Sequence, residues 1–153
     1  MLSYVMLVLH LIAAAIWVGG MGFALLALRP SLTLLEPPAR LAFHAAVLKR
    51  FFLLVWHAMP IMLITGWAMV FIEFGGFARL PMAINLMHGL GLIMAVVYVA
   101  IFFGPWATVR SSLAAGQPAA AAQGFARIRQ LVTLNFCLGL LTIAIAASRN
   151  VGE

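Results

Sequence analysis

Residues 2–28 read LSYVMLVLHLIAAAIWVGGMGFALLAL, an apolar run without a formal charge that ends at Arg29-Pro30. This run is longer than the roughly 20 apolar residues that a helix needs to cross a bilayer. One histidine, His10, lies inside it. An imidazole in hydrocarbon is costly unless it is paired, so a histidine within a membrane span marks a candidate functional site. Fold and function therefore both depend on what His10 contacts.

The composition of the whole chain agrees with a membrane protein. The 153 residues are 66% hydrophobic and 8% charged, and a soluble domain of this size cannot bury so much apolar surface. We therefore predict an all-α fold, an integral membrane four-helix bundle that forms a single transmembrane domain over residues 1–153. The four spans are expected at about residues 2–28, 51–72, 82–103 and 131–147.

The basic residues predict the orientation of this bundle. The net charge of +6 arises from side chains at the ends of the spans, where they orient the protein and meet anionic lipid, so we expect no nucleic-acid partner. The positive-inside rule places both termini on the outer (periplasmic) side of a bacterial inner (cytoplasmic) membrane. Seven basic residues fall on the inner side, namely Arg29, Arg40, Lys49, Arg50, Arg110, Arg127 and Arg129, whereas Arg79 and Arg149 fall on the outer side.

Two of the four histidines lie at the same depth. With a rise of about 1.5 Å per residue, His10 and His88 both sit roughly 7 Å outside the midplane, on spans 1 and 3, which run in the same direction. Two imidazoles at one height in a helical bundle are a recurrent frame for a cofactor. We predict that they bind haem b between them as its two axial ligands.

The neighbours of this histidine pair suit a flat ligand. Small residues at helical spacing leave room beside each imidazole, and the two outer cations are expected to meet the haem propionates. The predicted cofactor-contacting residues are Trp17, Ala14, Gly91, Arg79 and Arg149.

Copper is the alternative ligand of the same histidines. Met6 precedes His10 by one helical turn, and Met87 adjoins His88. Nitrogen and sulfur ligands together suit Cu(I), which is a soft ion. The competing explanation is that these methionines serve packing and lipid contact, as methionines in apolar chains commonly do.

The two remaining histidines are expected to have other roles. His57 is alone at its depth, so its imidazole is expected to bond a carbonyl that Pro60 frees in the same helix. As a metal ligand, His57 has only Met21 as a soft partner. His44 is expected to be solvated or to face lipid. Asn85, Asn135, Thr65 and Thr142 are expected to hydrogen-bond between helices.

The chain resembles the CopD-like family of small bacterial membrane proteins, which is named after copper resistance protein D. The resemblance covers nearly the whole chain and is carried by HLIAAAIWVGGMGFALLALRPSL from His10, LKRFFLLVWHAM from Leu48, NLMHGLGLIMAVVYVAIFF from Asn85 and RIRQLVTLNFCLGLLTIAIA from Arg127. It implies copper uptake or export across the inner membrane. The general pattern is also similar to haem-containing membrane protoporphyrinogen oxidases and to b-type membrane cytochromes, in which histidines of the spans hold haem.

Three hypotheses about function follow. The first is a b-type haem protein for electron transfer or quinone-linked redox chemistry near the outer face, a membrane oxidoreductase with a quinone or a redox protein as its partner. The second is a copper-handling membrane protein, and the third is a non-catalytic membrane subunit whose histidines only join helices. The bilayer is the common partner, and an oligomer is compatible with each hypothesis. The only acids are Glu36, Glu73 and Glu153, so hydrolases and nucleotide-driven pumps are not expected.

Overall fold

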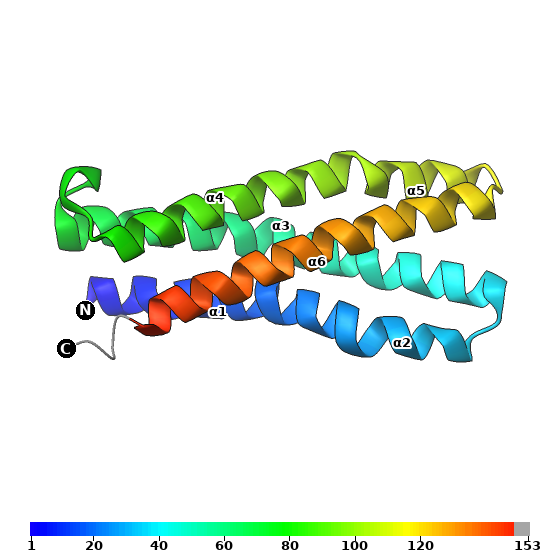
Figure 1. Ribbon diagram of the computed structural model, residues 1–153, viewed down its shortest axis with the longest axis horizontal. Coiled ribbons are helices and arrows are strands. Elements are labelled where there is room, and N and C mark those ends of the chain that lie inside the picture. Colours follow the sequence, from blue (N-terminus) through cyan, green and yellow to red (C-terminus); the bar gives the residue numbers. More distant parts are fainter. Residues whose placement is uncertain (149–153) are drawn as a thin grey trace.

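The protein is an elongated bundle of helices (Figure 1), described by a computed structural model for residues 1–148. No β-strand occurs within these residues, which confirms the all-α prediction. In chain order, the elements are α1 (Leu2–Phe23), the π-helical turn η1 (Ala24–Leu28), α2 (Arg29–Ser31), the 3-10 turn η2 (Leu32–Leu34), α3 (Pro37–Phe74), the 3-10 turn η3 (Phe77–Arg79), α4 (Met82–Phe103), α5 (Pro105–Ala114) and α6 (Pro118–Ser148).

Four helical segments are long and apolar enough to cross a membrane. They are Leu2–Leu34, Pro37–Phe74, Met82–Ala114 and Pro118–Ser148. The four-span membrane bundle predicted from the sequence is therefore confirmed. Figure 1 shows that α1 begins at the end of the bundle where α6 ends. The orientation of that end in the membrane remains a prediction.

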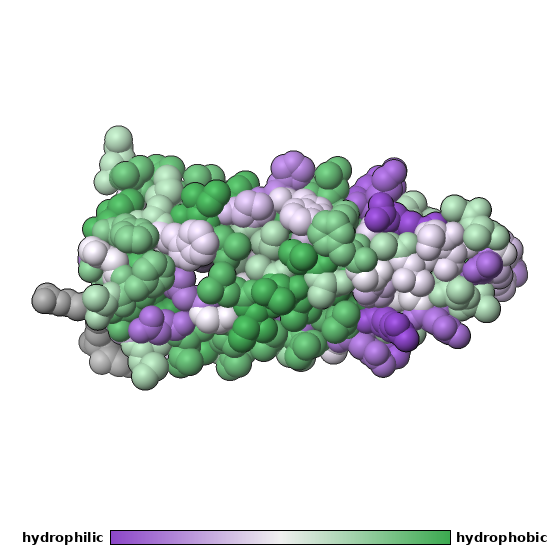
Figure 2. Space-filling model, turned by 90° about the horizontal axis from the view of Figure 1, so that it is seen from above, coloured by the Kyte–Doolittle hydropathy of each residue, from purple (hydrophilic) through white to green (hydrophobic). Residues whose placement is uncertain are grey.

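The bundle is longer than a bilayer is thick. The 38 residues of α3 extend over about 57 Å, whereas the hydrocarbon core is about 30 Å thick. Figure 2 shows an apolar zone over one end and the middle of the molecule, and hydrophilic groups gathered toward the other end. That end carries the first halves of α3 and α6, which lie outside the expected spans 51–72 and 131–147. Because α3 is longer than the hydrocarbon core, we expect the bundle to continue beyond the membrane at its basic end.

The first helical segment does not end at Arg29-Pro30. Proline lacks the N–H of a regular helix, and its ring crowds the preceding turn. The turn before Pro30 widens to a π-helix, in which the N–H of Arg29 donates to the oxygen of Ala24. Helical backbone then continues to Leu34, and the break comes at Glu36, which precedes Pro37 at the start of α3.

Packing arranges the helices in two pairs. α1 lies along α3, and α4 with α5 lies along α6. In Figure 1, α1 and α4 are on opposite sides of the bundle, with α3 and α6 between them. Gly139 permits the close approach of α6, because a Cβ there would lie 2.9 Å from Val18 Cγ2 and 3.2 Å from Met94 Cε.

The middle of the bundle is held by buried aromatic and polar contacts. The Tyr98 hydroxyl donates to the Phe52 oxygen at 2.7 Å, and the Tyr98 ring packs edge-on against Trp17. Asn135 donates from Nδ2 to the Met94 oxygen at 3.2 Å, so its expected interhelical hydrogen bond is confirmed. These contacts join α3 to α4, α4 to α1, and α6 to α4. For Thr142 and Asn85 the same expectation is wrong, because they donate locally, to the Leu138 and Leu80 oxygens.

Candidate functional site

The predicted histidine pair meets at a glycine of a third helix. His10 on α1 and His88 on α4 both approach Gly66, which is buried on α3. An ideal Cβ at Gly66 would lie 3.2 Å from His10 Cε1, 3.6 Å from His10 Nδ1 and 4.0 Å from His88 Nε2. A side chain at Gly66 would require the His10 ring to shift by a few tenths of an ångström, whereas 4.0 Å to His88 is an ordinary contact.

The hydrogen bonds of His10 fix which of its nitrogens is free. The Thr65 hydroxyl has one proton, and its shortest contact is with the Ile61 oxygen at 2.6 Å. It therefore accepts from His10 Nδ1–H, at 3.1 Å. These partners assign the proton of the neutral ring to Nδ1, which leaves a lone pair on His10 Nε2.

His88 has the same arrangement. Its Nδ1 lies 3.2 Å from the Ile84 oxygen, which can only accept, so Nδ1 carries the proton. Its Nε2 therefore carries the lone pair, and this is the nitrogen that approaches Gly66. Metal-ligating histidines commonly donate their other N–H to a carbonyl or another acceptor. Phe77 of η3 packs edge-on against His88, with ring centroids 5.7 Å apart, and covers part of the site.

Of the three methionines considered above as sulfur ligands, Met6 and Met87 lie within one helical turn of the pair, whereas Met21 is eleven residues from His10. Met6 and Met87 are half-buried, whereas Met21 is in the core, with 2% of its surface exposed. Within residues 1–148, no cluster of three or more His, Cys, Asp or Glu side chains is arranged to hold a metal ion. The site therefore offers two imidazoles, and Met6 and Met87 are the thioethers nearest to them in the sequence.

The other residues predicted to contact a cofactor are distributed along the bundle. Ala14 is half-buried one turn from His10, and Gly91 is buried with no atom within 4 Å of where its Cβ would be. Trp17 belongs to the aromatic core around Tyr98. Arg79 is in η3, and only its backbone is described, whereas Arg149 lies outside the described residues.

The two other histidines differ from what we expected. His57 is exposed, and its Nδ1–H donates to the Leu53 oxygen at 2.8 Å, so the expected bond to the carbonyl freed by Pro60 is wrong. His44 is half-buried and stacked on Phe125, with ring centroids 4.3 Å apart, so the expectation of a solvated or lipid-facing ring is also wrong.

A comparison with known families places this geometry in context. The family model described as Copper resistance protein D matches residues 45–149, which include most of α3 with Gly66 and all of α4 with His88. The chain belongs to the copper resistance protein D family. Its membership agrees with the resemblance stated above, although α1 with His10 lies outside the matched residues. No curated protein and no solved structure matches the chain.

The family changes the order of our hypotheses about the ligand. Copper fits a CopD protein better than the haem that we predicted first, and no comparison supports the likeness to haem-containing oxidases and cytochromes. Sequence reasoning also missed Gly66 and Phe77. The only signal for Gly66 was a Thr-Gly pair in the middle of an otherwise apolar span.

Proposed function

We propose that this CopD protein handles copper within the membrane and binds Cu(I) between His10 and His88. The observation that best supports this proposal is that two imidazoles from opposite sides of the bundle approach Gly66. Each of them donates its Nδ1–H to a protein oxygen. The remaining Nε2 lone pairs are metal ligands, and imidazole suits copper. Copper is the cargo in this proposal.

The position of the pair suits uptake from one end. Both histidines lie in the half of the bundle that contains the N-terminus of α1, away from the basic end. Met6 precedes His10 by one helical turn and Met87 adjoins His88, and thioethers favour the reduced ion. Two neutral imidazoles add no positive charge of their own, which reduces the cost of bringing a monovalent cation into hydrocarbon.

The test is a Cu(I) competition titration with a colorimetric chelator on purified wild type, His10→Ala and His88→Ala. Loss of a residue that only hydrogen-bonds to a ligating histidine lowers metal affinity about 10–100-fold. Loss of the ligating histidine itself is therefore expected to lower Cu(I) affinity at least about 100-fold. His57→Ala is the matched control, because His57 is a span histidine whose imidazole is exposed. Unchanged Cu(I) affinity in both site variants would refute the proposal.

Haem b on the same two nitrogens is the second candidate. The open space beside Gly91, one turn from His88, favours it, because a macrocycle needs room that a single ion does not. An absorption spectrum separates the two ligands. An intense Soret band that both alanine variants lose would favour haem. Without that band, weaker Cu(I) binding in Met6→Leu or Met87→Leu would favour copper.

A further inference from the structure

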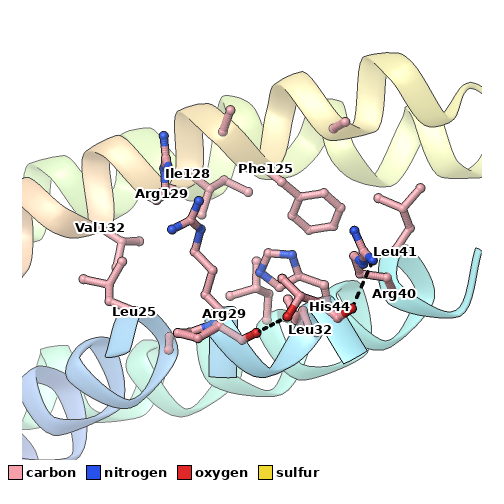
Figure 3. Close-up of a pocket in the computed structure, with 16 residues that line it drawn as sticks. Leu25, Arg29, Leu32, Arg40, Leu41, His44, Phe125, Ile128, Arg129 and Val132 are labelled. Carbon is pink, nitrogen blue, oxygen red and sulfur yellow. Dashed lines mark hydrogen bonds between the residues drawn. The ribbon is translucent and has the colours of Figure 1, made fainter. Parts of the chain in front are cut away.

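A second site lies at the basic end of the bundle, far from the histidine pair along the helices. A cavity of about 550 Å³ opens between the α1–α2 segment, the first part of α3 and the first half of α6 (Figure 3). Its inner wall is apolar, and the stacked rings of His44 and Phe125 form part of it. The other apolar side chains that line it include Leu25, Leu32, Leu41, Ile128 and Val132.

Three arginines line this cavity. Arg40 is held in place, because its Nη2 donates to the Leu35 oxygen at 2.9 Å and its Nε donates to the same oxygen at 3.2 Å. Arg29 extends from α2 across the cavity toward α6, which carries Arg129 (Figure 3). Neither this cavity nor the adjoining one has an acidic residue in its lining. Two guanidinium groups on facing elements favour an anion between them.

The cavity continues into the apolar zone. A second hollow shares Leu25, Arg29 and Arg129 with the first and is also lined by Leu26 and Phe136. Leu26 precedes Arg29 on a helical segment that runs toward the basic end, and Phe136 follows Arg129 on α6, which runs away from it. Both therefore lie nearer the middle of the membrane than the arginines. A groove with cations at its mouth and apolar walls below them has the polarity of a phospholipid.

We propose that Arg29 and Arg129 bind the phosphate of an anionic phospholipid, with an acyl chain along Leu26 and Phe136. Basic pockets between helices at a membrane surface bind anionic headgroups through this chemistry. The site is separate from the histidine pair and is independent of the copper proposal. A bound lipid would fill the gap between the α1–α2 segment and α6 that protein side chains leave open.

The experiment measures lipid retained by the full-length protein. Wild type, Arg29→Gln, Arg129→Gln and the double variant are delipidated in detergent and titrated with dioleoylphosphatidylglycerol, and binding is read by native mass spectrometry. Arg110→Gln is the matched control, because Arg110 on α5 is at the same end but lies over the rings of Phe102 and Trp106. Each lost site arginine is expected to weaken binding roughly fivefold, and both together about 25-fold. The control should stay within about twofold of wild type.

Three outcomes would overturn the proposal. The first is a double variant that binds the anionic lipid as wild type does. The second is an equal loss in Arg110→Gln, which would mean that the general positive charge of this end attracts lipid. The third is equal binding of dioleoylphosphatidylcholine or of inorganic phosphate alone, which would identify a site for lipid tails or for free anions. Retained helical circular dichroism in each variant keeps a folding defect from imitating a loss of binding.

Discussion

Replacement of Thr65 by valine is the most direct test of the hydrogen bonds around the histidine pair. The Thr65 side chain is 4% exposed, and its hydroxyl accepts from His10 Nδ1–H at 3.1 Å. Valine has the same shape and the same branching at Cβ, so it preserves the local helix and packing. It cannot accept a hydrogen bond, so the imidazole N–H loses its partner in an apolar setting.

The magnitude follows from that one bond. A donor left without a partner in a buried site costs about 1–3 kcal/mol. The His10 ring is then expected to rotate toward another acceptor. This rotation would move Nε2 away from the position in which it can bind the same metal ion as His88. Loss of such an outer partner lowers metal affinity by about 10–100-fold. We therefore expect Thr65→Val to bind Cu(I) 10–100 times more weakly than wild type.

The assay is the Cu(I) competition titration, with helical circular dichroism as the measure of folding. Thr142→Val is the control, because the Thr142 hydroxyl is half-buried on α6 and donates only within its own helix, to the Leu138 oxygen at 2.8 Å. The reasoning is refuted if folded Thr65→Val binds Cu(I) as tightly as wild type. It is equally refuted if Thr142→Val loses as much affinity, since the effect would then be a general one of threonine loss.

Three further predictions concern other positions. Gly66→Ala should weaken Cu(I) binding on the order of tenfold, because the new Cβ would lie 3.2 Å from an imidazole carbon of His10. Gly91→Ala is the control and should leave the affinity unchanged, since no atom lies within 4 Å of its Cβ position. His57→Ala should leave copper binding intact and cost less than about 1 kcal/mol in stability, as its exposed ring bonds only its own helix; loss of copper would make it a ligand. A Gln117→Cys variant in a Cys137→Ser background should react with an impermeant maleimide only from the cytoplasmic side, and labelling from the periplasm would reverse the predicted orientation.

Composition and periodicity were sufficient to predict the membrane bundle. The thickness of hydrocarbon sets the length of each apolar run, so four runs could be counted without knowledge of their packing. Hydropathy does not detect the part of a helix that extends from the apolar span into water. It therefore placed the start of the second span near Phe51, although α3 begins at Pro37, and it did not predict the partly buried stacking of His44 on Phe125 beyond the membrane.

The depth of a residue could be predicted from the sequence, but its lateral neighbours could not. The constant rise of a helix put His10 and His88 at one height, and the structure does bring them to the same residue. We placed a ligand between spans 1 and 3 without foreseeing a third helix at the site, yet α1 and α4 lie on opposite sides of the bundle (Figure 1) and both histidines approach α3. Side-to-side order depends on the packing of all four helices, which a single sequence does not display.

This arrangement makes α3 part of the site even though it supplies neither imidazole. Thr65 contacts the His10 ring through its hydroxyl, and the missing side chain of Gly66 allows the close approach of that ring to the helix. The separation of the two Nε2 atoms therefore depends on where α3 lies between α1 and α4. A small shift of α3 along its axis would move the Thr65 acceptor and would leave the Ile84 acceptor of His88 in place, because that carbonyl belongs to α4 itself. The His10 side of the pair is thus the adjustable one, and substitutions on α3 should act on copper binding chiefly through His10.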